Sequence, residues 1–168
     1  TTAIFANIIP IDHFLKSAVI FTILIMGIGL QFYIGIGNYK KLDYFFLFRI
    51  NSFFIIIVTF LIAVGGTTFG LAEETIAFYP ILIPVFLAAR YDAMVALASI
   101  YLGTSVGTMC STTNPFSVII ASDAAGINWT TGMSGRIVVF VLATTICILY
   151  ILRYAQKIKK DASKSIIY

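Results

Sequence analysis

The feature that most constrains this chain is an uncharged run from Ala93 to Ser122. An apolar run of about 18 or more residues is typical of a membrane span. Its middle is polar, however, and Pro115 lacks an N–H and disfavours helix at the residue before it. The pattern predicts a helix over 92–122 that breaks near 107–115 and then resumes. A proline kink in an otherwise ordinary span is the alternative, and this segment by itself leaves both open.

Composition supports a membrane location for the whole chain. Hydrophobic residues make up 60% of it and charged residues 11%, whereas soluble domains average about 25% charged residues. The mean hydropathy is +1.02. The net charge of +4 comes from short basic clusters between apolar runs, which indicates topology and not nucleic-acid binding. Cys110 and Cys147 lie in apolar surroundings and predict two thiols and no disulfide framework.

We therefore expect an all-α integral membrane protein with a single membrane domain over 1–168. The range 15–37 predicts a transmembrane helix, and the Lys40–Lys41 pair after it indicates a cytoplasmic end. The range 134–154 predicts another transmembrane helix, and the basic tail 155–168 is expected in the cytoplasm. The first residues contain no initiator Met and no basic leader region, so we expect a piece of a longer protein.

The range 46–90 contains two apolar arms around a polar tip at 65–74. Each arm is about 15 residues, or roughly 22 Å of helix, which is short of the roughly 30 Å hydrocarbon core. A re-entrant helical hairpin is therefore expected, although the charges flanking the range also allow two full spans.

Several polar residues in these interruptions are candidates for binding. Glu73 and Glu74 are carboxylates near membrane depth, which indicates function. Solvation at the opposite interface would explain them as well, and so would complementarity to the dipole of the second arm, since both lie in its first turn. The hydroxyl groups of Thr67, Thr68, Thr112 and Thr113 and the Asn114 amide are oxygen donors that suit Na⁺. Small residues at Ser99, Gly103 and Gly107 permit a close helix crossing.

Two stretches carry a family resemblance: 65–80, Gly-Gly-Thr-Thr-Phe-Gly-Leu-Ala-Glu-Glu-Thr-Ile-Ala-Phe-Tyr-Pro, with Ile83-Pro84, and 103–116, which ends in Ser-Thr-Thr-Asn-Pro-Phe. They resemble the YfcC-like branch of the anaerobic four-carbon-dicarboxylate carrier family, within the ion transporter superfamily. The resemblance implies two inverted repeats in which a re-entrant hairpin meets a broken (unwound) helix. This chain would then be most of one repeat, facing the second repeat of the full-length chain in a homodimer of the bacterial inner membrane.

The resemblance implies a secondary active transporter, either an ion-coupled symporter or an exchanger. Its small-molecule substrate would be a dicarboxylate or a basic amino acid, and it would need no cofactor beyond Na⁺ or H⁺ as coupling ion. The substrate- or ion-binding residues would be Gly66, Thr67, Thr68, Glu73, Glu74, Thr112, Thr113, Asn114 and Pro115, with Na⁺ at Thr67, Thr68, Thr112 and Asn114.

The hairpin tip departs from the Ser-Asn-Thr of the sodium symporters in the superfamily, which leaves the coupling ion and the substrate charge open. The sequence contains no hydrolase, metalloenzyme or phosphate-loop motif, so we expect no enzyme. The alternatives are a non-transporting membrane scaffold or assembly subunit, in which the glycines serve packing, and a channel.

Overall fold

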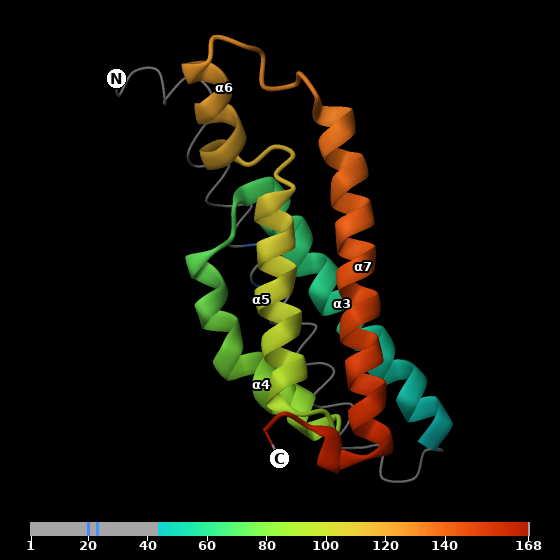
Figure 1. Cartoon of the computed structure of the whole chain (residues 1–168). Coiled ribbons are helices and arrows are strands. Elements are labelled where there is room, and N and C mark those ends of the chain that lie inside the picture. Colours follow the sequence, from blue (N-terminus) through green and yellow to red (C-terminus); the bar gives the residue numbers. More distant parts are fainter. Residues whose placement is uncertain (1–19, 21–22, 24–43, 168) are drawn as a thin grey trace.

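A computed structural model describes positions 20 and 23 and residues 44–167 (Figure 1). Side chains are described at 20, 23 and 52–167. The expected transmembrane helix at 15–37 lies outside the described residues, apart from Ile20 and Ile23. Within the described part every regular element is a helix. The expected all-α fold is therefore confirmed for this part of the chain.

The predicted hairpin begins with α3 (Tyr44–Phe69), followed by the 3₁₀-helix η1 (Glu73–Phe78) and α4 (Tyr79–Ala88). Its tip is shorter than the expected 65–74, because the residues up to Phe69 remain helical. Gly70 ends α3 with a φ of +75°, and its N–H donates to the Gly66 carbonyl at 3.1 Å. A glycine in the left-handed conformation is a common helix terminator.

The first arm is also longer than the sequence indicated. Helix α3 has 26 residues, which is roughly 39 Å at 1.5 Å per residue. The glycines near its end were expected to interrupt it, since glycine disfavours helix. They remain helical because Gly66 packs directly against the backbone of α5.

The uncharged run forms α5 (Ala93–Met109), the π-helical turn η2 (Pro115–Ile119) and the short α6 (Ile120–Ala124). Asp92 caps the start of α5, since its Oδ1 accepts from the Val95 N–H at 2.8 Å. Helix α5 continues through Gly107, so the interruption covers 110–114 and is narrower than the expected 107–115. The interruption ends at Pro115, which has no N–H to donate into a preceding turn.

The last long helix is α7 (Met133–Lys160), which extends six residues beyond the expected 134–154. Ala155 and Ile158 in this extension are buried, and basic residues in the last turn suit the negative end of a helix. The expected tail 155–168 is therefore helical over its first part. It continues into the 3₁₀-helix η3 (Ala162–Lys164).

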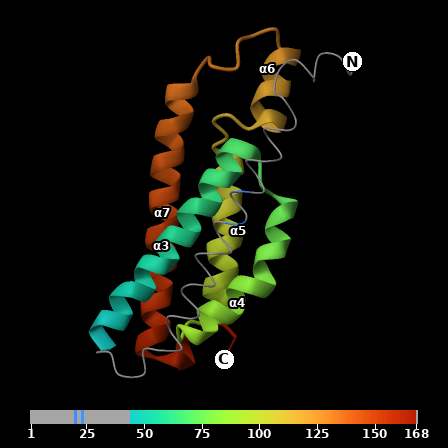
Figure 2. The ribbon, with the colours of Figure 1, turned by 180° about the vertical axis from the view of Figure 1, so that it is seen from behind.

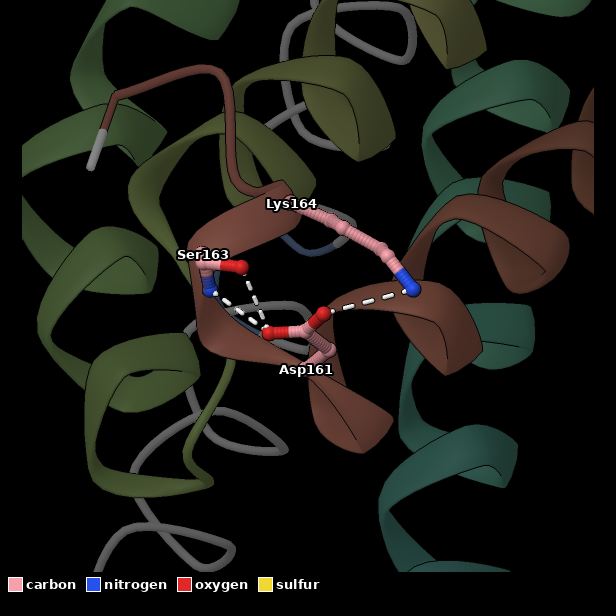
Figure 3. Close-up of polar contacts among 3 residues, drawn as sticks. All are labelled: Asp161, Ser163 and Lys164. Atoms are coloured by element: carbon pink, nitrogen blue, oxygen red, sulfur yellow. Dashed lines mark hydrogen bonds and ion pairs between the residues drawn. The ribbon is translucent and has the colours of Figure 1, made fainter.

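Asp161 joins α7 to η3 (Figure 3). Its Oδ1 accepts from the Ser163 hydroxyl at 2.7 Å and the Ser163 N–H at 3.2 Å. Its Oδ2 lies 3.3 Å from the Lys164 ammonium. The Ser163 hydroxyl, followed by Lys164, lowers the pKa of this carboxyl below its usual range.

Helices α3, α5 and α7 pack together, and α4 lies against the opposite side of α5 (Figures 1 and 2). The α3–α5 crossing is close because glycines line it. A Cβ on Gly107 would lie 2.3 Å from the Ala63 carbonyl oxygen, and one on Gly103 would lie 3.0 Å from that of Thr59. The close crossing that Gly103 and Gly107 permit is present, and its partner is α3 of the same chain.

Among the described residues, two helices are long and apolar enough to cross a membrane, Ser52–Phe69 within α3 and Met133–Lys160. They differ in how much of their surface the rest of the protein covers. Half of the α3 window is buried, whereas only 17% of the α7 window is. Most large apolar side chains of α7 therefore point away from the other helices, among them Val138, Leu142, Ile146 and Leu149.

Candidate functional site

The end of α3 and the interruption after α5 meet in a buried polar junction. The Thr67 hydroxyl donates to the Cys110 carbonyl oxygen at 2.8 Å and accepts from the Thr112 N–H at 3.1 Å. The Thr67 carbonyl oxygen accepts from the N–H groups of Thr112 and Thr113, at 3.0 and 3.3 Å. Backbone groups at the end of α3 and in the segment after α5, which lack partners within their own helices, thus find hydrogen-bond partners across the junction, because buried backbone groups require partners.

Asn114 organises the chain that follows the interruption. Its Oδ1 accepts from the N–H groups of Phe116 and Ser117, at 2.9 and 3.3 Å. Its Nδ2 donates to the hydroxyls of Ser111 and Ser117, at 3.2 and 3.1 Å. An asparagine side chain that caps the next turn is a common way to start a helix. Pro115 then occupies the first position of η2, where an N–H is not required.

The predicted threonines differ in how accessible they are. Thr67 and Thr112 are buried, at 3% and 7% exposed, and their hydroxyls lie 3.3 Å apart. Thr68 and Thr113 are only partly buried. The Thr68 hydroxyl donates within its own helix to the Val64 carbonyl at 2.6 Å, and Thr113 makes a longer bond of 3.4 Å to the Thr68 carbonyl. Thr68 and Thr113 are therefore the hydroxyls with the better access for a solute.

Glu73 and Glu74 lie at the start of η1 and are both exposed. The Glu74 Oε2 accepts from the Ala72 N–H at 3.2 Å, and the nearby Thr75 hydroxyl donates to the Ala72 carbonyl at 2.5 Å. These contacts satisfy the backbone at the turn between α3 and η1. Both acids lie in the first turn of η1, which is where the helix-dipole alternative places them. The described contacts do not join either carboxylate to the Thr67 junction.

Gly66 lies at the helix crossing, where a Cβ would come within 3.0 Å of the Thr104 carbonyl oxygen. Glycine at this position allows α3 and α5 to pack closely beside the junction, and it offers no side chain to a ligand.

The junction also includes residues outside the predicted set: Gly70, Cys110, Ser111 and Ser117. The two serines stand three residues before and three residues after Asn114, a spacing at which short polar side chains meet. That spacing was a usable signal. The contact of Gly70 with Asn114 had no such signal, because the two residues are 44 positions apart in the sequence.

No group of three or more His, Cys, Asp or Glu side chains among the residues with described placement could hold a metal ion. A Na⁺ site would instead use hydroxyl, amide and carbonyl oxygens. The Na⁺ site at Thr67, Thr68, Thr112 and Asn114 stays a prediction.

Residues 46–166 match the family DcuC, described as the C4-dicarboxylate anaerobic carrier. An uncharacterized protein of Haemophilus influenzae is 53% identical over 119 residues, which cover 70% of this chain and 23% of that protein. The Escherichia coli protein named "Putative basic amino acid antiporter YfcC" is 37% identical over 101 residues, which cover 60% of this chain and 20% of that protein.

The chain thus spans about a fifth to a quarter of the length of these two relatives. No solved structure matches it significantly. Because the family match extends from the first turn of α3 through η3, it includes both helix interruptions and the junction between them. The chain therefore belongs to the DcuC family of C4-dicarboxylate anaerobic carriers, which are membrane carriers and not enzymes.

Proposed function

We propose that the full-length protein is a secondary active transporter, an ion-coupled symporter or an exchanger, of small carboxylates or amino acids. The observation that carries the proposal is the junction of two helix interruptions, in which Thr67 at the end of α3 binds Cys110 and Thr112 after α5. Broken helices that meet in this way are typical of carrier binding sites.

In this proposal α3, η1 and α4 form a hairpin whose tip faces the broken helix within the membrane. The hairpin is either re-entrant or fully spanning, since α3 by itself is long enough to cross a membrane. Non-helical backbone at membrane depth is tolerated where protein or a water-filled cavity surrounds it. The burial of Thr67, Thr112 and Asn114 by the rest of the chain supports such a position. A second repeat, a homodimer and a bacterial inner-membrane location belong to the same proposal.

The names of the family and of the Escherichia coli relative refer to different solutes, a four-carbon dicarboxylate and a basic amino acid. Both solutes carry a carboxylate, which backbone N–H groups at interrupted helices can bind. They differ in the remaining group, which is anionic in one and cationic in the other. The exposed carboxylates of Glu73 and Glu74 would favour the cationic solute.

The coupling ion in this proposal is Na⁺ or H⁺. Hydroxyl and carbonyl oxygens at Thr68 and Thr113 supply hard-cation ligands, and both residues are only partly buried. Glu73 or Glu74 would carry the proton if the coupling ion is H⁺.

Counterflow into proteoliposomes of the purified full-length protein tests the proposal. Vesicles loaded with unlabelled arginine, ornithine or a four-carbon dicarboxylate should accumulate the same labelled solute from outside. Repeating the uptake with a Na⁺ gradient, a proton gradient or neither separates symport from exchange. Folded protein that shows no counterflow with either solute class would contradict transport and favour the scaffold alternative.

Two substitutions then separate the solutes. Glu73→Gln and Glu74→Gln remove the carboxylates with little change in shape. If the solute is a basic amino acid held by one of them, its half-saturation concentration should rise by about tenfold, which is about 1.4 kcal/mol of lost binding. Unchanged transport in both variants would remove the glutamates from the site.

A further inference from the structure

We infer that Asn114, together with Gly70, is a positioning residue that fastens the end of α3 to the chain after the α5 interruption, and that its amide does not bind the transported solute or ion. Our sequence-based prediction placed Asn114 among the ligands. The structure points to the different role because of what the amide already contacts. Only the transport readout of the test rests on the proposed function.

The Asn114 amide has no spare hydrogen-bonding capacity. A side-chain amide offers two acceptor lone pairs and two N–H donors. In Asn114 the oxygen accepts from two backbone N–H groups, and the nitrogen donates to two serine hydroxyls. The side chain is also only 2% exposed. A ligand could bind this amide only by displacing one of these bonds, which leaves a buried group unsatisfied.

Gly70 fixes the amide from the other side. A Cβ on Gly70 would lie 2.7 Å from both Oδ1 and Nδ2 of Asn114. Gly70 also has a φ of +75°, which residues other than glycine rarely adopt. Glycine is thus required at this position for its backbone conformation and, independently, for the space that Asn114 fills.

The contact joins two points that are far apart in the sequence. Gly70 directly follows α3, and Asn114 directly precedes η2. The Thr67 bonds to Cys110 and Thr112 lie on the same two segments. The end of α3 and residues 110–117 should therefore move as one unit, because separating them would expose several buried polar groups at once.

A double-mutant cycle on the full-length protein tests the contact. Gly70→Ala, Asn114→Ala and the double variant would be compared in detergent by thermal unfolding. Gly70→Ala should lower the unfolding midpoint strongly in the wild-type background and much less in the Asn114→Ala background. The backbone cost at Gly70 remains in both backgrounds, whereas the steric conflict exists only with Asn114. An equal loss in both backgrounds would overturn the inference.

Transport kinetics test the role. Asn114→Ala should lower the maximal rate while the half-saturation concentrations for solute and coupling ion stay within about twofold of wild type. Asn114→Ser should recover much of the rate, because a serine hydroxyl can also cap the next turn. A rise of about tenfold in either half-saturation concentration in both variants would make Asn114 a ligand instead.

Asn128 provides the matched control. Its Oδ1 accepts from the Thr130 N–H at 3.0 Å and the Thr130 hydroxyl at 2.9 Å in an exposed loop. Asn128→Ala removes the same kind of cap without touching α3, so the unfolding midpoint and the transport should barely change. If wild-type protein unfolds cooperatively but transports nothing, the proposed function fails, and the thermal cycle still decides whether Asn114 and Gly70 are coupled.

Discussion

The Thr67 hydroxyl lies 2.8 Å from the Cys110 carbonyl oxygen, and this bond joins two helix ends that are 43 residues apart in the sequence. One hydroxyl donates to the end of α5 and accepts from the Thr112 N–H beyond it. The polar stretches that interrupt the two apolar segments are therefore partners of each other, and this pairing leads to the first prediction.

Thr67→Val should destabilise the protein by about 1–3 kcal/mol, because it removes a buried hydroxyl. The Cys110 carbonyl oxygen would lose its donor, and the Thr112 N–H would lose one of its two acceptors. Chemical denaturation in detergent measures the change. Thr145→Val is the control, since the Thr145 hydroxyl is exposed and bonds only within its own helix, to Val141 at 2.7 Å. Equal stability of the two variants would show that the junction contributes nothing.

Gly107→Ala should destabilise the protein by about 1–3 kcal/mol, because the added methyl group forces α3 and α5 apart. The Cβ would lie 2.3 Å from the Ala63 carbonyl oxygen, which is backbone and cannot rotate away. Gly135→Ala in α7 is the opposite case, since a Cβ there meets nothing within 4 Å. That variant should gain up to about 1 kcal/mol from helix propensity. A stable Gly107→Ala variant would mean that the crossing is looser than described.

Asp92→Ala should destabilise the other end of the bundle by about 1–3 kcal/mol, since it removes the α5 cap and leaves two hydroxyls without their acceptor. The Asp92 Oδ2 accepts from Tyr154 at 3.0 Å and from Ser165 at 2.7 Å. Asp92→Asn should lose less, because asparagine also caps helices. Hydrogen exchange at the amides of 165–167 measures release of this tail, and unchanged protection would contradict the predicted link.

Cysteine labelling should distinguish a carrier from a packed scaffold. Native Cys110 and Cys147 are buried, so a membrane-impermeant thiol reagent should label wild-type protein slowly. Thr68→Cys and Thr113→Cys should label faster, and substrate should slow that labelling if both positions line an aqueous site. Asn128→Cys in the exposed loop between α6 and α7 serves as the control, because the reagent should reach it and substrate should not affect it. If substrate changes the labelling rate of none of the three variants, the result would favour the non-transporting scaffold.

Local pattern was sufficient for much of the fold. The apolar runs predicted helices where α5 and α7 occur, Pro115 marked the end of the α5 interruption, and Gly103 and Gly107 indicated a close crossing. The helix ends were less accurate. Residues 65–69 looked like a polar tip but remain helical, because packing of Gly66 on α5 outweighs the weak helix preference of glycine.

The candidate site, like the fold, was predicted only in part from the sequence. The sequence placed Thr67, Thr112 and Asn114 in one group. The structure joins Thr67 to Thr112, and it places Asn114 against Gly70, three residues after Thr67. It does not bring Glu73 and Glu74 into that group, since both are exposed on η1. Composition indicated that each residue type could serve a carrier, but it carried no information on which hydroxyls were already engaged in hydrogen bonds.

The sequence by itself determined the helical, membrane-type character of the described residues and the approximate positions of the two interruptions, because hydrophobic runs and proline act locally. Only the tertiary structure decided that Thr67 binds Cys110 and Thr112 and that Gly70 makes room for Asn114. These contacts join residues 43 to 45 positions apart. They form because buried backbone groups at interrupted helices must find partners, and the α3–α5 crossing is what brings those partners within reach.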